Sequence, residues 1–276
     1  MALAMLTVVG IGFTSCGDDD SNSSGGNNSF FPKSYVKEFT YTRPMSTQKR
    51  TCSYTYDSNN LVTRIDQNLE DSYIKIDYNK DNTVVFQYYS KTDNSPLYKF
   101  VVTLNSNGSA SSVTLSEGNK SELTYNDNNQ LESITSYENG KKTRGYNFEY
   151  SDGDLVKATF LYWENEKLTH TEVEANILYV TDTQGMIDNV GGIMNYERLM
   201  GISFDSFVLP ADLSLIFPTG LFGKPTKHLP LYVIPRPEFN YSHFTNNFTL
   251  DSSKRVISAS NNYYEYSSSN SFIWEW

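Results

Sequence analysis

The three histidines come first, because an imidazole can act as a general base or a metal ligand near neutral pH. They are His170, His228 and His243. None stands at a metal-site spacing from a second histidine, a cysteine or a carboxylate. His170 and Glu172 would share one face of a predicted strand, but a cross-strand surface pair explains them better than a metal site does. We therefore expect no bound metal.

Motifs of the common hydrolases and redox enzymes are absent from the sequence: it has no HExxH, no Cys-x-x-Cys and no Gly-x-Ser-x-Gly. Glu164 and Glu166 could form a glycosidase pair, yet nothing distinguishes them from Glu172 or Glu174. The oxygen-rich run Asn126–Asn129 lacks the ligand spacing of a calcium loop and suits a hairpin turn. The sequence predicts no catalytic residue and no cofactor.

Aromatic side chains are the residues with the best prospect of binding a ligand. Tyr162 and Trp163 are adjacent on a predicted strand, and Trp274 and Trp276 close the chain. Flat rings on a sheet can stack on sugars or fill a protein interface. Core packing and ordinary cross-strand pairing are the alternative explanation for each ring.

The beginning of the chain has the order of a lipoprotein leader. Residues 1–15 carry no charge, and the apolar run from Ala2 to Phe13 is too short to span a bilayer. Small residues then lead into Cys16, which a lipoprotein signal peptidase would leave as a lipidated first residue. An ordinary secretory signal is the alternative. We expect a signal peptide over 1–15 and a membrane anchor on Cys16.

Residues 16–29 should form a flexible tether, since no large apolar side chain follows the cysteine there. Asp18, Asp19 and Asp20 resemble the surface-export signal of Bacteroidetes lipoproteins. That resemblance implies an outer-membrane, cell-surface location, whereas the plainer interpretation is a solvated spacer.

The net charge and the cysteine count argue against nucleic-acid binding and against disulfide bonds. The formal net charge of −10 argues against nucleic-acid binding. With Cys16 acylated, only Cys52 remains, so no intramolecular disulfide can form. We expect residues 30–276 to form one domain, and without a disulfide that domain must be held by packing and hydrogen bonds.

That domain should be all-β. The 21 Tyr and 16 Phe of the whole chain favour strands, and period-two alternation appears, for example, across Ile74–Tyr78 and Tyr146–Tyr150. Similar turns follow Tyr56, Tyr78, Leu104, Tyr125 and Tyr150, and each interval between two such turns holds one hairpin. The prediction is an antiparallel β-hairpin meander, which either stays open or closes into a barrel-like sheet.

The Tyr-Asp-x-x-x-x-Leu turn resembles the YD-type repeat of extracellular β-structures. The arrangement is also similar to a family of Bacteroidetes surface lipoproteins of unknown function with a porin-like fold, over about residues 35–180 and 237–276. The stretch Gly223–Pro230, with its Gly-Lys-Pro-x-x-x-Leu-Pro pattern, belongs to this likeness. The resemblance implies no catalytic residue.

Residues 181–237 break the hairpin rhythm, because they are rich in Gly and Pro and also strongly apolar. We expect an irregular insertion packed on an open end or face of the sheet, with one short helix near Tyr196–Met200. A loop that enters the membrane is the alternative.

Three functions remain. The sequence favours a non-enzymatic, membrane-anchored surface lipoprotein that binds a glycan, a peptide or a partner protein. An outer-membrane, porin-like β-barrel is the second, and the terminal aromatic Trp276 suits it. A carboxylate-dependent glycan hydrolase is the third and the least supported.

Overall fold

The fold is that of a computed structural model. It describes residues 35–42, 48–116, 119–181, 185–202, 204, 208–209, 213–239, 243–263 and 266–275. The predicted signal peptide, the predicted lipidation site and the predicted tether lie outside these residues, as does Trp276.

Antiparallel strands account for most of the described chain. They are β1 (Tyr35–Thr42), β2 (Lys49–Tyr56), β3 (Val62–Gln67), β4 (Ser72–Tyr78), β5 (Thr83–Ser90), β6 (Pro96–Leu104), β7 (Ala110–Ser116), β8 (Asn119–Tyr125), β9 (Leu131–Glu138), β10 (Lys141–Ser151), β11 (Asp154–Glu164), β12 (Lys167–Leu178), β13 (Tyr232–Pro235), β14 (Phe244–Leu250), β15 (Val256–Tyr263) and β16 (Tyr266–Glu275). Each strand pairs with its sequence neighbours. The predicted all-β meander is confirmed.

The sheet closes into a barrel, because β1 also pairs with β16. That pairing runs from Tyr35 opposite Glu275 to Tyr41 opposite Asn270. The seam between β13 and β14 is much shorter and joins only two residue pairs. Of the two outcomes that the sequence left open, the closed one is therefore observed.

The barrel has two different ends. The turns after β2, β4, β6, β8, β10 and β14 carry the repeated motif, and we call this end the repeat rim. The turns after β3, β5, β9 and β11 lie at the other end, the hairpin rim. Since neighbouring strands run in opposite directions, β1 begins at the repeat rim, and β12 and β16 end there.

Four of the repeat-rim turns, those after β2, β6, β8 and β14, share one hydrogen-bond pattern. Asp57 Oδ1 accepts the backbone N–H groups of Asn59 and Leu61 at 2.8 and 2.9 Å. In the same way, Asn126 Oδ1 accepts those of Asn128 and Gln130 at 3.0 and 2.9 Å. Asn105 and Asp251 repeat this geometry. The oxygen-rich run at Asn126 is thus explained by turn chemistry, as the sequence predicted.

The tyrosine of the repeat has a structural role at the same rim. Its hydroxyl donates to a backbone carbonyl near the start of the preceding strand. The pairs are Tyr56 to Val36 at 2.7 Å, Tyr78 to Val62 at 3.2 Å, Tyr125 to Ala110 at 2.8 Å, Tyr150 to Leu131 at 3.0 Å and Tyr179 to Leu155 at 3.0 Å. Each bond satisfies a phenol that packs against the core. Burial raises the pKa of the Tyr125, Tyr150 and Tyr179 hydroxyls above the ordinary value, which keeps them neutral donors.

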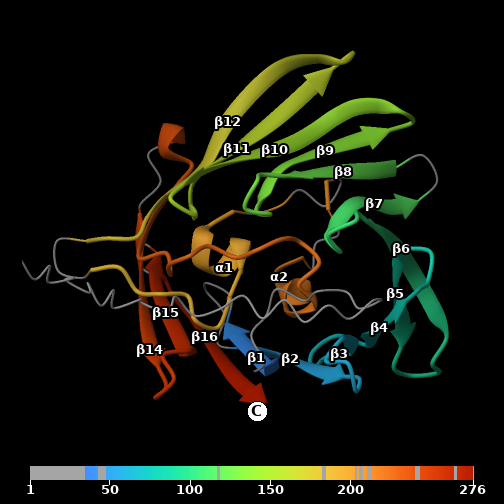
Figure 1. The fold of residues 1–276 in the computed structure, drawn as a ribbon, viewed down its shortest axis with the longest axis horizontal. Helices are drawn as coiled ribbons and strands as arrows, with labels where there is room; N and C mark the ends of the chain where they lie inside the picture. Colours follow the sequence, from blue (N-terminus) through green and yellow to red (C-terminus); the bar gives the residue numbers. More distant parts are fainter. Residues whose placement is uncertain are drawn as a thin grey trace, which may run out of the picture.

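The insertion fills the barrel. Figure 1 shows its helices α1 (Tyr196–Met200) and α2 (Leu213–Ile216) inside the ring of strands. A 3-10 helix, η1 (Phe217–Thr219), follows α2, and a second, η2 (Pro237–Phe239), follows β13. The side chains of Leu199, Met200 and Ile202 are 0–1% exposed. The predicted helix at 196–200 is present, and the irregular apolar insertion is confirmed.

One segment of the insertion differs from the prediction. The sequence indicated no regular strand between residues 181 and 237, yet Tyr232–Pro235 forms β13 between β12 and β14. Proline disfavours a strand interior because it lacks an N–H donor. Pro235 is the last residue of this short strand, where the cost of the missing donor is small.

The alternation of side chains along each strand separates an apolar inner face of the barrel from a polar outer face. On β4, Ile74 and Ile76 are buried, whereas Lys75 and Asp77 are exposed. The inward side chains contact the insertion: Phe39 meets Phe217 edge-on at 6.1 Å between ring centroids. The outer face carries charged side chains along many strands, including Lys75, Lys99, Lys120, Glu122, Glu132 and Glu149, all of them exposed. The inside is therefore apolar and filled, and the outside is polar.

Candidate functional site

The Gly-Lys-Pro stretch of the insertion runs along the repeat rim. The backbone N–H of Lys224 donates to the Asn129 carbonyl at 2.8 Å, and that of Lys227 donates to the Gly153 carbonyl at 3.1 Å. Gly223 has φ +88°, and a Cβ there would lie 2.8 Å from the Asn129 carbonyl oxygen. This stretch therefore has to approach the turn closely, which only glycine permits.

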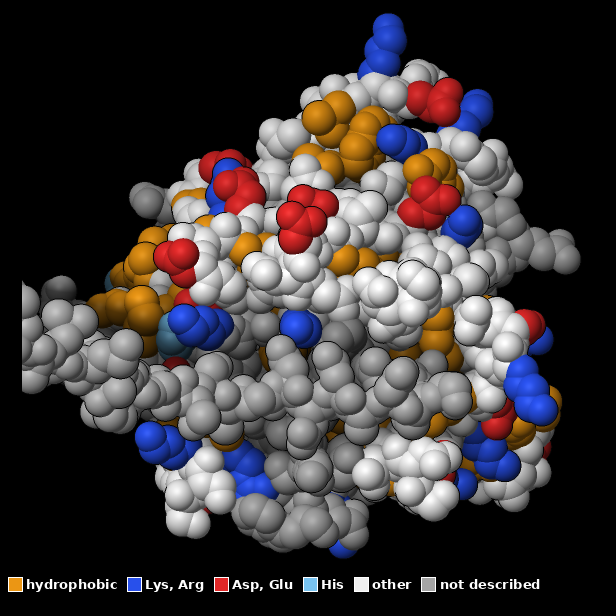
Figure 2. All heavy atoms as spheres, in the orientation of Figure 1, with side chains coloured by type: hydrophobic (Ala, Val, Ile, Leu, Met, Phe, Trp, Pro, Cys, Tyr) orange, Lys and Arg blue, Asp and Glu red, His pale blue; other side chains and the backbone are white. Residues whose placement is uncertain are grey.

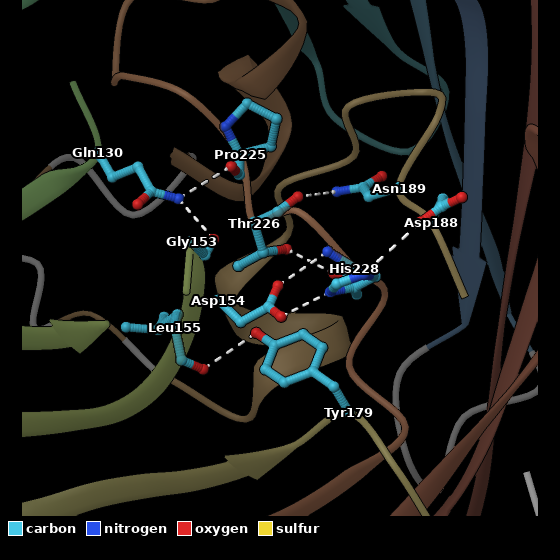
Figure 3. A network of polar contacts seen from close by, with 10 residues as sticks. All are labelled: Gln130, Gly153, Asp154, Leu155, Tyr179, Asp188, Asn189, Pro225, Thr226 and His228. Carbon is cyan, nitrogen blue, oxygen red and sulfur yellow. Dashed lines mark hydrogen bonds and ion pairs between the residues drawn. The ribbon is translucent and has the colours of Figure 1, made fainter. Parts of the chain in front are cut away.

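A buried Asp–His pair secures this stretch (Figure 3). Asp154 Oδ2 lies 2.7 Å from His228 Nδ1, and Asp154 Oδ1 accepts the backbone N–H of His228 at 2.8 Å. The two side chains are 7% and 10% exposed. Asp154 begins β11, whereas His228 lies in the insertion, so the pair joins the barrel wall to its filling. Sequence reasoning missed Asp154, because nothing local marks it.

The chemistry open to this pair is limited. A carboxylate at Nδ1 orients the imidazole and directs Nε2 toward Asp188 Oδ1, which is 3.6 Å away. Such a pair could assist a nucleophile. Both hydroxyls of the network donate to backbone carbonyls instead, Thr226 to His228 at 2.8 Å and Tyr179 to Leu155 at 3.0 Å. The Asp154–His228 pair therefore serves to hold the backbone of the insertion in place.

Amide side chains complete the network in Figure 3. Gln130 Nε2 donates to the carbonyls of Gly153 and Pro225 at 2.7 and 3.2 Å. Asn189 Nδ2 donates to the Thr226 carbonyl at 3.1 Å. Irregular backbone leaves carbonyls that no sheet satisfies, and these amides satisfy them. We interpret this network as structural, because it holds the insertion to the repeat rim, and we call it the latch.

A different cluster lies on β11 and β12 toward the hairpin rim. Phe160 stands opposite Glu172, and Tyr162 stands opposite His170. The Phe160 ring contacts the buried Tyr146 ring at 5.3 Å between centroids, so this face of the hairpin points to the inside of the barrel. Tyr162, His170 and Glu172 share that face, because side chains alternate along a strand.

Arg236, directly after β13, joins two carboxylates in this cluster. Its Nη2 lies 3.2 Å from Glu174 Oε1, and its Nε lies 3.4 Å from Glu172 Oε1. Arg236 has φ +40°, an uncommon conformation for a side chain of this size. Desolvation raises the pKa of the Glu174 carboxyl, and the Arg236 guanidinium opposes that rise. Glu174 is only 4% exposed and serves as the buried counter-charge.

Solvent reaches three other members of the cluster, whereas the Glu172 side chain is only 13% exposed. Tyr162 is 39% exposed, and the His170 and Arg236 side chains are 58% and 44% exposed. His170 Nε2 lies 3.6 Å from Glu172 Oε2, so the expected shared face is observed. Within the described residues no group of three His, Cys, Asp or Glu side chains could hold a metal ion. We call Tyr162, His170, Glu172, Glu174 and Arg236 the mouth cluster. It offers a ring, a guanidinium and a carboxylate to a polar ligand.

The other predicted aromatics do not join this cluster. A Cβ on Gly145 would lie 3.1 Å from the Trp163 ring, so Trp163 packs on β10. Gly145 precedes the inward-facing Tyr146, which places Trp163 on the outer surface. Trp274 belongs to β16, where the backbone alone is described, and Trp276 lies outside the described residues, as do Cys16 and Asp18–Asp20.

Comparisons with known proteins address the fold alone. No protein-family model and no curated protein matches the chain. Among solved structures, a porin-like protein from Bacteroides uniformis ATCC 8492 is similar, with 18% sequence identity and a TM-score of 0.62. The match covers 87% of this chain and 98% of that one. The chain therefore has a porin-like β-fold. Within the described residues, no helix combines the length and apolar character needed to cross a membrane.

Proposed function

We propose that this chain is a lipid-anchored surface protein whose water-facing barrel binds a glycan at the mouth cluster. The direction of the barrel's side chains carries the proposal. A membrane-spanning barrel needs an apolar outer band about 25 Å tall and has a polar lumen. Here Lys99, Lys120 and Glu122 are exposed on the outside, whereas Leu199 and Ile202 fill the inside. That polarity suits a domain surrounded by water.

Anchoring is the second part of the proposal. It rests on the apolar leader that ends at Cys16, and on a tether that keeps the barrel off the bilayer. Two acyl chains or more give stable retention. Asp18, Asp19 and Asp20 would act as the signal that sends the lipoprotein to the cell surface of the outer membrane.

Glycan binding follows from the chemistry of the mouth cluster. The Tyr162 ring offers a flat apolar surface for a sugar face, while Arg236 and Glu172 offer a donor and an acceptor for hydroxyl groups. A peptide or a partner protein is the alternative ligand. Binding without hydrolysis is favoured because the Glu174 carboxyl is only 4% exposed and is paired with the Arg236 guanidinium at 3.2 Å.

Replacing Tyr162 by alanine should weaken binding to the retained glycan about tenfold, the equivalent of roughly 1.4 kcal/mol. A glycan array probed with the chain 29–276 would identify the ligand, and calorimetry would measure the affinity of each variant. Tyr98→Ala is the matched control, because Tyr98 is 56% exposed on a different hairpin. An array that retains no glycan, or equal losses for both variants, would contradict glycan binding at the mouth cluster.

A further inference from the structure

A group of large apolar side chains is exposed where the chain leaves β12. Leu178 and Val180 are 48% and 49% exposed, and Met186 and Val190 are 58% and 42% exposed. In Figure 2 hydrophobic side chains gather at the left edge of the molecule, on the side where Figure 1 shows the chain leaving β12. Clustered exposed apolar side chains mark an interaction site more often than scattered ones do.

These four side chains flank one segment of the insertion. The backbone N–H of Leu231 donates to the Leu178 carbonyl at 2.9 Å, and that of Leu229 donates to the Ile187 carbonyl at 2.8 Å. The chain at Leu178 and the chain at Asp188 therefore both run beside residues 228–232. Since β12 ends at the repeat rim, we call Leu178, Val180, Met186 and Val190 the rim patch.

The start of the barrel lies at the same rim. The Tyr56 hydroxyl, at the end of β2, donates to the Val36 carbonyl at the start of β1 at 2.7 Å. Between Cys16 and Tyr35 the chain has 18 residues. A flexible chain of that length has a root-mean-square reach of about 20–25 Å. A lipid on Cys16 would therefore hold the repeat rim near the bilayer, while the hairpin rim points away.

We infer that the rim patch rests on the lipid surface to which the chain is anchored, and so orients the mouth cluster away from the membrane. This inference relies on the proposed anchor. The occupant is the bilayer, because the tether enters at the rim that carries the patch. Shallow insertion of a few apolar side chains adds to a lipid anchor without needing a transmembrane segment.

Site-specific fluorescence in vesicles tests the inference. The full-length lipidated chain is prepared as Met186→Cys and, as control, Leu168→Cys, which is 51% exposed at the hairpin rim. Cys52 is 1% exposed and should not react with a thiol-directed fluorophore in the folded chain. Each labelled protein is reconstituted into phosphatidylethanolamine–phosphatidylglycerol vesicles that contain brominated phosphatidylcholine.

The expected result is quenching several-fold stronger at position 186 than at position 168, with both proteins floating with the vesicles. Equal quenching at the two positions would overturn the rim contact while leaving the anchor intact. If Met186→Cys does not fold, Val190→Cys gives the same readout. Flotation that persists in Cys16→Ala, or is missing in the wild type, would overturn the proposed anchor and the inference with it.

Discussion

Replacing Ile202 by aspartate should leave no folded protein. Ile202 is fully buried inside the barrel, directly after α1 and Gly201. Removing such a side chain costs about 2–5 kcal/mol. Burying an unpaired polar group in its place adds roughly 2–7 kcal/mol. The total is comparable to the whole stability of a typical domain, about 5–15 kcal/mol.

The matched control is Ile257→Asp. Ile257 is 39% exposed on the outside of β15, so the same substitution should cost about 1 kcal/mol there. Circular dichroism and size-exclusion chromatography of both variants would measure the difference. Two equally well-folded variants would show that the insertion is a mobile loop and does not form the core of the barrel.

Asp154→Ala should destabilise the chain by about 2–6 kcal/mol, because it leaves two buried donors without an acceptor, each at a cost of roughly 1–3 kcal/mol. His228 would lose the acceptor of its ring N–H and also the acceptor of its backbone N–H. The latch between the insertion and the repeat rim would then be broken at its most buried point.

Asp188→Ala serves as the comparison, since Asp188 meets the same imidazole from solvent with a side chain that is 71% exposed. Its loss should cost under about 1 kcal/mol. Urea denaturation of the two variants provides the measurement. Equal shifts in the midpoint would mean that Asp154 has no special role in holding the insertion.

Local sequence signals predicted much of the fold. The turns after Tyr56 and Tyr125 contain both the acceptor and the donors of the hydrogen bonds that close them, so hairpins could be inferred from short stretches. The helix at Tyr196–Met200 was also visible in the apolar pattern. Barrel closure depends on β1 meeting β16 at the opposite end of the chain, which no local pattern specifies.

The candidate sites were harder to predict, because their partners are distant in sequence. Asp154 and His228 are 74 residues apart, and Glu174 and Arg236 are 62 residues apart. Tyr162 could be proposed as a ligand-stacking ring from its residue type alone. Its neighbour Trp163 was not separable from it, since the strand register decides which ring faces the mouth cluster.

A porin-like fold and a porin's environment are separate properties of a barrel. Strand number and connectivity determine the fold, whereas the alternation of apolar and polar side chains determines which solvent each face meets. On β4 the apolar residues Ile74 and Ile76 point inward, and Lys75 points outward. The chain thus combines porin-like topology with an outer face that carries charged side chains.

The most direct test of this account is sedimentation velocity of the chain 29–276, prepared without detergent. A polar outer face predicts a compact, folded monomer in plain buffer with an intact β-sheet dichroism spectrum. Aggregation in buffer, together with folding only after detergent is added, would contradict the account and indicate a barrel that spans the membrane.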